Sequence, residues 1–434
     1  MPRPGWSKSP PPAGARRVFG LLPARLWRRR PHNCKRRWQL ALLPGNRERL
    51  QQELEFCSAL GAVLLTVKGG SAPEAGHAYA RARELWEQLG SPVEYTRIAY
   101  GQSRYHATRG ELDQARRLDE DLLRLSSQRN DSTGLVLAYL SSGRNLMFAG
   151  RFASSRSRLE KVLALYDPVS HGSLVHQIGN YPQTLSQAVL GIVLFCLGYP
   201  DQALKWSSAA IAEARRLAHP PSFAQSLGYG ARLHALDGDN AALDERAGQL
   251  IAVATEQSFP EWRGYGVIYR GWAKVKSGDV AEGISLLRDG STALHVIGRE
   301  VGSPDFMTFL ANACEIAGQT EEAVTLLDDA LEIVERMGEH WFTAELNRHK
   351  GQLLLRQGHA EAAEDLYRKA LIIAQEQEAK LWELCAARSL ARLCGDQGRR
   401  EEARNILAPV YSWFTEGFGT ADLREAKALL DELE

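Results

Sequence analysis

The sequence of 434 residues is 44% hydrophobic, 24% charged and 8% aromatic, which supplies ample material for burial and excludes a chain that is disordered throughout. Its net charge of +1 conceals a split, because residues 1–47 hold 12 of the 53 Lys and Arg residues and none of the 52 acidic residues, so that residues 48–434 are acidic by 11 charges. The sequence has no run of 18 apolar residues and no C-x-x-C pair among its six cysteines, which argues against a membrane span and a zinc site and favours a reduced, cytoplasmic compartment.

Residues 1–47 form a basic leader that is rich in proline and arginine and has no apolar periodicity, so we expect it to be disordered. Its segment WRRRPHNCKRRW, from Trp27 to Trp38, also suits nucleic-acid binding, with tryptophans stacking on bases, or a basic targeting signal. Because the composition changes abruptly at residue 48, we favour a third interpretation, in which the start of this reading frame was never selected for folding. The acidic charge of residues 48–434 argues against nucleic-acid binding elsewhere.

From residue 48 onward a glycine returns at a fixed interval. The nine positions are Gly70, Gly110, Gly150, Gly198, Gly238, Gly278, Gly318, Gly358 and Gly398. Seven of the eight intervals are 40 residues and one is 48. Glycine tolerates the left-handed backbone conformation that ends a helix. The period therefore predicts a repeat protein in which each glycine marks the turn between helix A and helix B of a hairpin.

The neighbours of these glycines support the hairpin interpretation. Seven residues before the glycine a small side chain recurs in every unit except the first, at Ser103, Gly143, Gly191, Ala231, Gly271, Ala311, Gly351 and Ala391. Five residues after it, small residues recur in every unit except the fifth, at Ala75, Ala115, Ser155, Ala203, Gly283, Ala323, Ala363 and Ala403. Since small residues let two helices approach closely, we predict that these two positions face each other within each hairpin.

The irregular 48-residue interval carries an insertion, DPVSHGSLVHQIGNYPQT, over residues 167–184. Its prolines and glycines predict that helix B stops early and a loop follows. Loops inserted into one repeat often lie on a binding face, and the side chains that suit a partner are His171, His176, Asn180 and Tyr181. The alternative is a longer connector with no role of its own. We expect no metal there, because the two histidines lack a third ligand nearby.

Three tryptophans, Trp262, Trp341 and Trp382, recur 23 or 24 residues after their glycines, at the start of helix A. An aromatic residue at one structural position in several repeats is typical of packing between hairpins, so we interpret them as structural. The last segment, from about Thr420 to Leu433, begins with Thr and Asp and ends heavily charged. We predict that it forms a C-terminal capping helix whose outer face is polar.

No nucleotide-binding or hydrolase motif is present. A phosphate loop needs G-x-x-x-x-G-K-[ST], and the sequence contains no Gly-Lys pair. Patterns of the type G-x-S-x-G, H-E-x-x-H and the EF-hand are also absent. We therefore predict no catalytic, cofactor-binding or metal-binding residues.

The 40-residue unit resembles the tetratricopeptide (TPR) superfamily, whose usual unit is 34 residues, and is similar to the TPR-like region of MalT-type regulators. After about residue 310 the sequence looks like the C-terminal region of bacterial proteins that join a class III adenylate or guanylate cyclase to an ATPase and a TPR-like array. The shared elements are Trp341 with residues 344–346, Trp382 with Glu383, and residues 408–418.

The resemblance implies an all-α, TPR-like right-handed superhelical solenoid of about nine hairpins plus the capping helix over residues 48–434. It implies a protein-interaction scaffold whose concave groove, lined mainly by A helices, holds a protein or peptide, with a cyclase or ATPase module as the expected partner. The chain would then be the regulatory tail, or a fragment, of a cyclic-nucleotide signalling protein. The alternatives are a cyclase-related enzyme lacking its catalytic domain and a sensory module of a transcription regulator.

Overall fold

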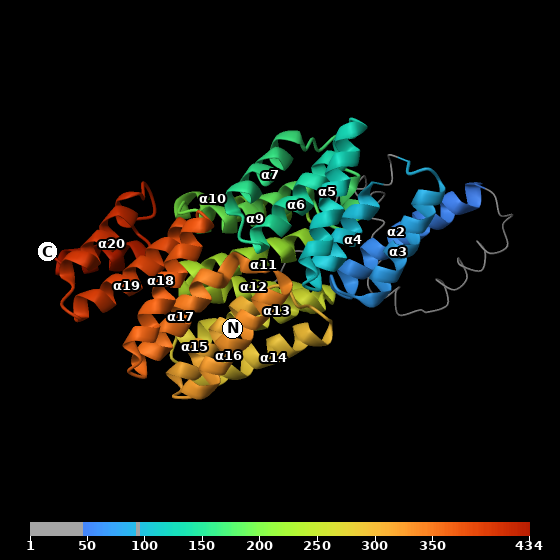
Figure 1. The fold of residues 1–434 in the computed structure, drawn as a ribbon. Helices are drawn as coiled ribbons and strands as arrows, with labels where there is room; N and C mark the ends of the chain where they lie inside the picture. The colour runs from blue at the N-terminus through green and yellow to red at the C-terminus, as the bar shows by residue number, and fades with distance from the viewer. Residues whose placement is uncertain (1–46, 93–95) are drawn as a thin grey trace, which may run out of the picture. The chain divides into compact units, whose positions relative to one another are not determined.

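The computed structural model describes residues 47–92 and 96–434, and the account below concerns those residues. Within them every regular element is a helix and strands are absent (Figure 1). The predicted all-α class is therefore confirmed. The predicted basic leader lies outside the described residues, apart from Arg47, where the first described helix begins.

The described helices pair into nine consecutive hairpins and a final helix. In chain order the hairpins are α2 (Arg47–Val67) with α3 (Pro73–Gln88), α4 (Arg97–Thr108) with α5 (Leu112–Gln128), α6 (Ser132–Phe148) with α7 (Phe152–Leu165), α9 (Pro182–Cys196) with α10 (Pro200–Arg216), α11 (Pro220–Asp237) with α12 (Asn240–Gln257), α13 (Pro260–Lys276) with α14 (Val280–Val296), α15 (Ser303–Ile316) with α16 (Thr320–Met337), α17 (Thr343–Arg356) with α18 (Ala360–Glu376), and α19 (Lys380–Asp396) with α20 (Arg400–Ser412). Two short helices, α8 (Leu174–Ile178) and η4 (His340–Phe342), lie between hairpins, and α21 (Ala421–Glu432) ends the array.

Eight of the nine repeat glycines have the left-handed conformation that the period predicts, with φ between +72° at Gly150 and +94° at Gly278. The first hairpin differs, because its left-handed residue is Gly69, with φ of +105°, and not Gly70. A side chain at a positive φ is strained, whereas glycine is not. The turn role of the repeat glycine is thus confirmed for every unit but the first.

The two small-residue positions face each other as predicted. In the third hairpin the Ser155 hydroxyl donates a hydrogen bond of 2.6 Å to the Gly143 carbonyl oxygen. In the sixth, a Cβ on Gly271 would lie 2.9 Å from the carbonyl oxygen of Gly283 on the facing helix. The absence of a side chain therefore sets how closely helices A and B approach each other.

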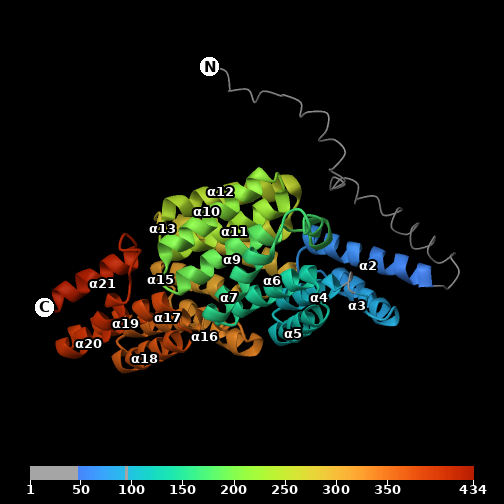
Figure 2. The ribbon, with the colours of Figure 1, turned by 90° about the horizontal axis from the view of Figure 1, so that it is seen from above.

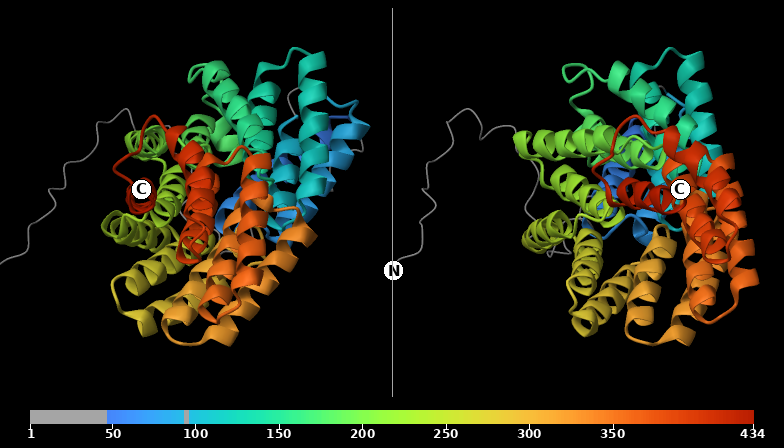
Figure 3. Two further views of the ribbon diagram at one scale, coloured as in Figure 1. Left: turned by 60° about the vertical axis from the view of Figure 1, so that its left-hand side comes forward. Right: turned by 90° about the vertical axis from the view of Figure 1, so that its left-hand side faces the viewer.

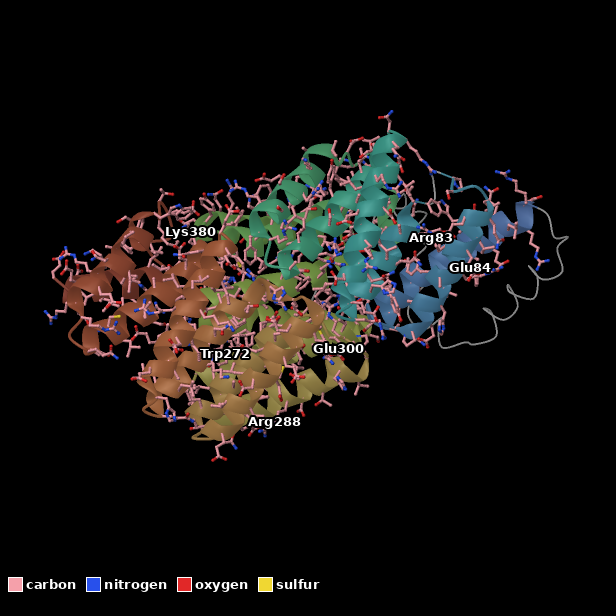
Figure 4. The ribbon with its side chains drawn as sticks, in the orientation of Figure 1. Arg83, Glu84, Trp272, Arg288, Glu300 and Lys380 are labelled. Atoms are coloured by element: carbon pink, nitrogen blue, oxygen red, sulfur yellow. The ribbon has the colours of Figure 1, made fainter. Side chains whose placement is uncertain are left out.

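The hairpins of the described residues coil into a right-handed superhelix with the A helices on its inner side (Figures 2 and 3). Successive turns of this superhelix are in direct contact. The backbone N–H of Gly70 donates to the Glu261 carboxylate at 2.8 Å, and the two residues are 191 positions apart. The N–H of Glu300, labelled in Figure 4, donates to the carbonyl of Thr108 at 3.1 Å. The first hairpins therefore rest on the sixth and seventh.

Contacts of the same kind join the fourth hairpin to the segment that follows the ninth. The backbone N–H of Gln202 donates to the Glu416 carboxylate at 3.0 Å, and the N–H of Gly417 donates to Asp201 at 3.2 Å. In three hairpins, a Cβ on the repeat glycine would lie within 3.0 Å of a side chain that belongs to the next turn of the superhelix. The pairs are Gly110 with Met337, Gly150 with Gln377, and Gly198 with Trp413.

The glycines of the later hairpins lack such neighbours. At Gly238, Gly278, Gly318, Gly358 and Gly398 an added Cβ would meet nothing within 4 Å. The second, third and fourth units thus need glycine both for its backbone conformation and for close approach, whereas the last five need it for conformation alone.

The helix α21 covers the last hairpin, as the sequence predicts, and buries Leu423, Ala426 and Leu429. Its N-terminus differs from the prediction. Thr420 occupies the N-cap position but its hydroxyl donates to the Gly417 carbonyl at 2.8 Å and accepts no N–H of the helix. The tight turn at Gly417, with φ of +79°, provides the nearer acceptor.

Candidate functional site

The A helices of the later hairpins, together with α21, surround an open groove on the inner side of the superhelix. Its cavity of about 230 Å³ is lined by side chains from α11, α13, α15, α17, α19 and α21, and by Asn240 and Leu243 of the B helix α12. A second cavity of about 460 Å³ shares Arg388 and Glu425 with the first and extends along α17 and α19 to Arg392. We call the two cavities together the C-terminal groove.

Most charges of the C-terminal groove are already paired. The buried Arg348 guanidinium lies 2.6 Å from the Glu345 carboxylate one turn away on α17. Burial alone would lower the pKa of Arg348, but the adjacent Glu345 carboxylate raises it. On α19, Arg388 lies 2.8 Å from Glu425 and 3.1 Å from Asp422 of α21. These pairs hold their side chains in fixed positions, which lowers the entropic cost of contacting a partner.

Two further groups of the C-terminal groove are His349, whose Nε2 lies 3.6 Å from the Glu345 carboxylate, and Lys276. His349 is half-buried, and its desolvation together with the Arg348 and Lys276 charges lowers its pKa well below its usual value. The Arg348 guanidinium donates to its Nε2 at 2.9 Å, so the ring is neutral. Lys276 is exposed and stands 5.5 Å from the centre of the Trp272 ring, which is labelled in Figure 4. Within the described part of the chain it has no carboxylate partner.

In the region of the insertion α7 ends at Leu165 and the short helix α8 follows. His171 is buried, with 4% of its surface exposed. Its Nδ1 accepts the Asp167 N–H at 3.0 Å, and its ring stacks on Tyr166. Asn180 is also 4% exposed. Both candidate residues therefore present little surface to a partner, and the contacts of His171 hold the start of the insertion in place.

The other two candidates of the insertion are more accessible. His176 is exposed on α8, whereas Leu174, Val175 and Ile178 of the same helix are buried. Tyr181 is partly exposed, and its ring contacts His219 edge to face with centroids 5.2 Å apart. The structure therefore does not bring the four predicted residues together as one surface.

The three recurring tryptophans lie in packed positions, in agreement with a structural role. Trp341 is fully buried and Trp382 is 3% exposed. The indole N–H of Trp382 donates to the Trp341 carbonyl at 3.2 Å, and its ring meets Phe195 of the preceding superhelical turn. Trp262 is only partly buried and packs on Tyr265.

One set of residues on the inner face escaped the sequence prediction. Arg104, Arg144 and Arg232 each lie six residues before a repeat glycine and are 7%, 7% and 4% exposed. A superposition of the repeats would have shown that basic residues share one position of helix A. Burial of these charges could not have been predicted, because it depends on how the hairpins coil.

Glu364, Cys394 and Glu402 form a group of potential metal ligands, with ligand atoms within 4.8 Å of one another. The two carboxylates are already bridged by Arg399, at 2.5 Å from Glu364 and 2.9 Å from Glu402, and by Arg368. This group is thus an ion-pair network between α18 and α20.

Family models agree with the fold. A tetratricopeptide repeat model matches residues 306–376, and a second tetratricopeptide repeat model matches residues 96–118 and 386–409. The chain is 26% identical over 233 residues to an uncharacterized protein of Rhizobium meliloti (strain 1021), a match that covers 53% of this chain and 22% of that protein. The chain therefore spans only about a fifth of this relative.

Solved structures of similar fold share little sequence with the chain. A Rap protein complexed with Competence and Sporulation Factor superposes with a TM-score of 0.52 at 11% identity, covering 79% of this chain and 98% of that one. The apo quorum sensor NprR of B. thuringiensis gives 0.51 at 14% identity, covering 84% and 98%. The predicted TPR-like solenoid is confirmed, and TPR repeats are typical of protein-interaction scaffolds. None of the described helices combines the length and apolar character that a membrane crossing requires.

Proposed function

We propose that this chain is a scaffold that holds a segment of a partner protein in the C-terminal groove and performs no catalysis of its own. The observation that carries the proposal is an open groove lined by consecutive A helices, with its charges preorganised in pairs. Lys276 adds an exposed cation beside the Trp272 ring. Aromatic and basic side chains in a recessed surface are typical of residues that dominate binding energy.

The partner that the sequence favours is a cyclase or ATPase module of a cyclic-nucleotide signalling protein. The resemblance of residues 310–434 to the region that follows such modules supports this choice. The much greater length of the Rhizobium meliloti relative also agrees with an array that adjoins further domains. The chain would then regulate cyclic-nucleotide synthesis by contact.

The insertion supplies a second contact in this proposal. Of its four candidate residues, exposed His176 and partly exposed Tyr181 are the ones that can reach a partner without a change in the fold, whereas His171 and Asn180 would keep the loop in shape.

The groove is tested by two matched charge reversals. Lys276→Glu changes an exposed lysine of the C-terminal groove, and Lys369→Glu changes an exposed lysine on α18, a B helix. A partner recovered from the source cell with the wild-type chain is identified and purified, and its affinity for the three proteins is measured directly. We expect Lys276→Glu to weaken binding about tenfold, which corresponds to about 1.4 kcal/mol. Lys369→Glu should bind like the wild type.

Equal binding by all three proteins would contradict the groove, and failure to recover any specific partner would contradict the scaffold. The enzyme alternative has its own measurement. The purified chain with ATP and a divalent metal should produce no cyclic AMP, and measurable synthesis would overturn the proposed function.

A further inference from the structure

A separate, smaller cavity on the inner face lies outside the C-terminal groove, at the other end of the array, between the first and second superhelical turns. It has a volume of about 20 Å³, and the residues used below are Arg104, Arg144, Gln225, Tyr229 and Arg299. A cavity of this size holds one or two water-sized atoms. We call it the arginine cavity.

Two arginines of this cavity lack a counter-charge. Arg104 and Arg144 are each 7% exposed, and among the described residues neither has a carboxylate within ion-pair distance. The Arg104 guanidinium donates to the Ile178 carbonyl at 3.2 Å. The Arg144 guanidinium donates to the Asn145 side chain at 3.4 Å, and its Nε finds no acceptor. A buried charge without a partner is destabilising, so it indicates a missing group.

The surrounding charges do not balance these arginines. Arg299 is paired with Glu261 at 2.8 Å. The other carboxylate that acts on Arg144 is Asp119, which is buried and accepts a hydrogen bond of 2.7 Å from Asn145. The printed partners of these two carboxylates are thus Arg299 and Asn145, and neither carboxylate forms an ion pair with Arg104 or Arg144 among the described residues.

Neighbouring groups do not supply a counter-charge for these two arginines. Arg232 has its own counter-ion in Asp305, at 3.3 Å. Glu339 lies nearby in the same interior, but burial raises its pKa to about 8, so it is mainly neutral at pH 7. Arg104 and Arg144 therefore remain without an ion pair in the described part of the chain.

We propose that the arginine cavity binds a carboxylate of the partner segment, either an acidic side chain or a chain terminus. A planar carboxylate offers two oxygens that match the guanidinium fork, whereas a phosphate carries four and needs more space than this cavity provides. Gln225 lines the same cavity, and its buried side-chain oxygen has no hydrogen-bond partner. With the amide flipped, its NH₂ group would take that position and donate to the ligand. This inference rests on the proposed scaffold function and assigns its partner an acidic segment.

The test uses the full chain with hexaglutamate as the probe and hexaglutamine as the neutral comparison, at about 0.15 M salt. Arg144→Gln removes a cavity charge, and Arg117→Gln removes an exposed charge of α5 as a matched control. We expect Arg144→Gln to bind hexaglutamate at least tenfold more weakly than the wild type, with hexaglutamine unaffected. Arg117→Gln should bind like the wild type, since both variants keep the basic residues 1–47.

Equal loss in both variants, or no loss in either, would overturn the carboxylate site. Because Arg144→Gln changes a buried residue, its helical content and melting temperature are measured first. A second measurement needs no variant: hexaglutamate carrying a benzophenone is cross-linked to the wild-type chain by light. Cross-links at Tyr229 or Trp262, which are partly exposed beside the cavity, support the site. Cross-links confined to residues 1–47 contradict it.

The outcome is separable from that of the proposed function. If Lys276→Glu keeps partner binding while Arg144→Gln loses hexaglutamate, the C-terminal groove is wrong and the arginine cavity stands. If Lys276→Glu loses the partner and Arg144→Gln keeps hexaglutamate, the arginine cavity is wrong and the C-terminal groove stands.

Discussion

Individual buried charges set the electrostatic character of this solenoid. Both carboxylate oxygens of Glu339 accept the Gly302 N–H at 3.0 Å, and one accepts the Trp341 indole N–H at 3.2 Å. Burial raises the pKa of Glu339 from 4.5 to about 8 despite these donors, and the nearby Asp305 carboxylate adds to the rise. At neutral pH the folded chain therefore holds a proton on Glu339 that the unfolded chain has already released.

This proton makes stability depend on pH. Because the folded pKa lies above the unfolded one, the contribution of Glu339 is fully present below about pH 4.5 and is lost as the pH rises to about 8. We expect Glu339→Gln, which cannot ionise, to unfold at higher urea than the wild type at pH 8.5. The gain should exceed about 1 kcal/mol and shrink toward pH 5. Exposed Glu332→Gln on α16 is the control, and an equal gain there would contradict the account.

For individual residues, the sequence did not predict which polar side chains are buried and which are exposed. His171 and Asn180 were chosen as accessible groups, yet both are buried. Arg104 and Arg144 were not chosen at all, because a single arginine on a helix is usually a solvated residue. Their burial follows from contacts between hairpins distant in the sequence, which no local pattern contains.

The helical hairpin is the element that the sequence predicts best. The spacing of glycines and small residues predicts nine turns and the faces on which helices A and B meet, because these depend only on neighbours within one repeat. The departures are local. Gly69 replaces Gly70 in the first turn, and Thr420 turns its hydroxyl toward Gly417. Both involve a choice between adjacent backbone groups that residue type alone does not decide.

Two glycine substitutions test the packing of the hairpins. A Cβ on Gly271 would lie 2.9 Å from backbone atoms of Gly283 and Leu287, whereas a Cβ on Gly248, within α12, would meet nothing within 4 Å. We expect Gly271→Ala to destabilise the chain by about 2 kcal/mol. Gly248→Ala should stabilise it by about 0.5 to 1 kcal/mol through helix propensity. Urea unfolding measures both, and stabilisation by both variants would contradict close helix approach.

On the scale of the whole array, successive superhelical turns touch, and this property was not predicted. The contact of Gly70 with Glu261 spans 191 residues and depends on a small rotation between hairpins that accumulates over five repeats. The handedness and the inner position of the A helices follow from the family resemblance. The closeness of the turns does not, because it is decided by side chains such as Gln377 and Trp413 that meet the glycine turns.

A pair of turn glycines isolates this contact. Gly150 and Gly358 both have positive φ, at +72° and +89°, but only Gly150 faces the next superhelical turn, at Gln377. Each change to Ala should cost about 1 to 2 kcal/mol through backbone strain. Gly150→Ala should cost about 1 kcal/mol more, because its Cβ would collide with the neighbouring turn. Equal losses in urea unfolding would show that the turns do not press on each other in solution.

The central claim is that a partner binds on the inner face formed by the A helices. Hydrogen–deuterium exchange of the full chain, with and without the purified partner, tests it most directly. We predict slower exchange in α13, α17 and α19, whose side chains line the C-terminal groove, and unchanged exchange in the B helices α14, α16 and α20, which contribute no side chain to it. Protection confined to those B helices would contradict the account.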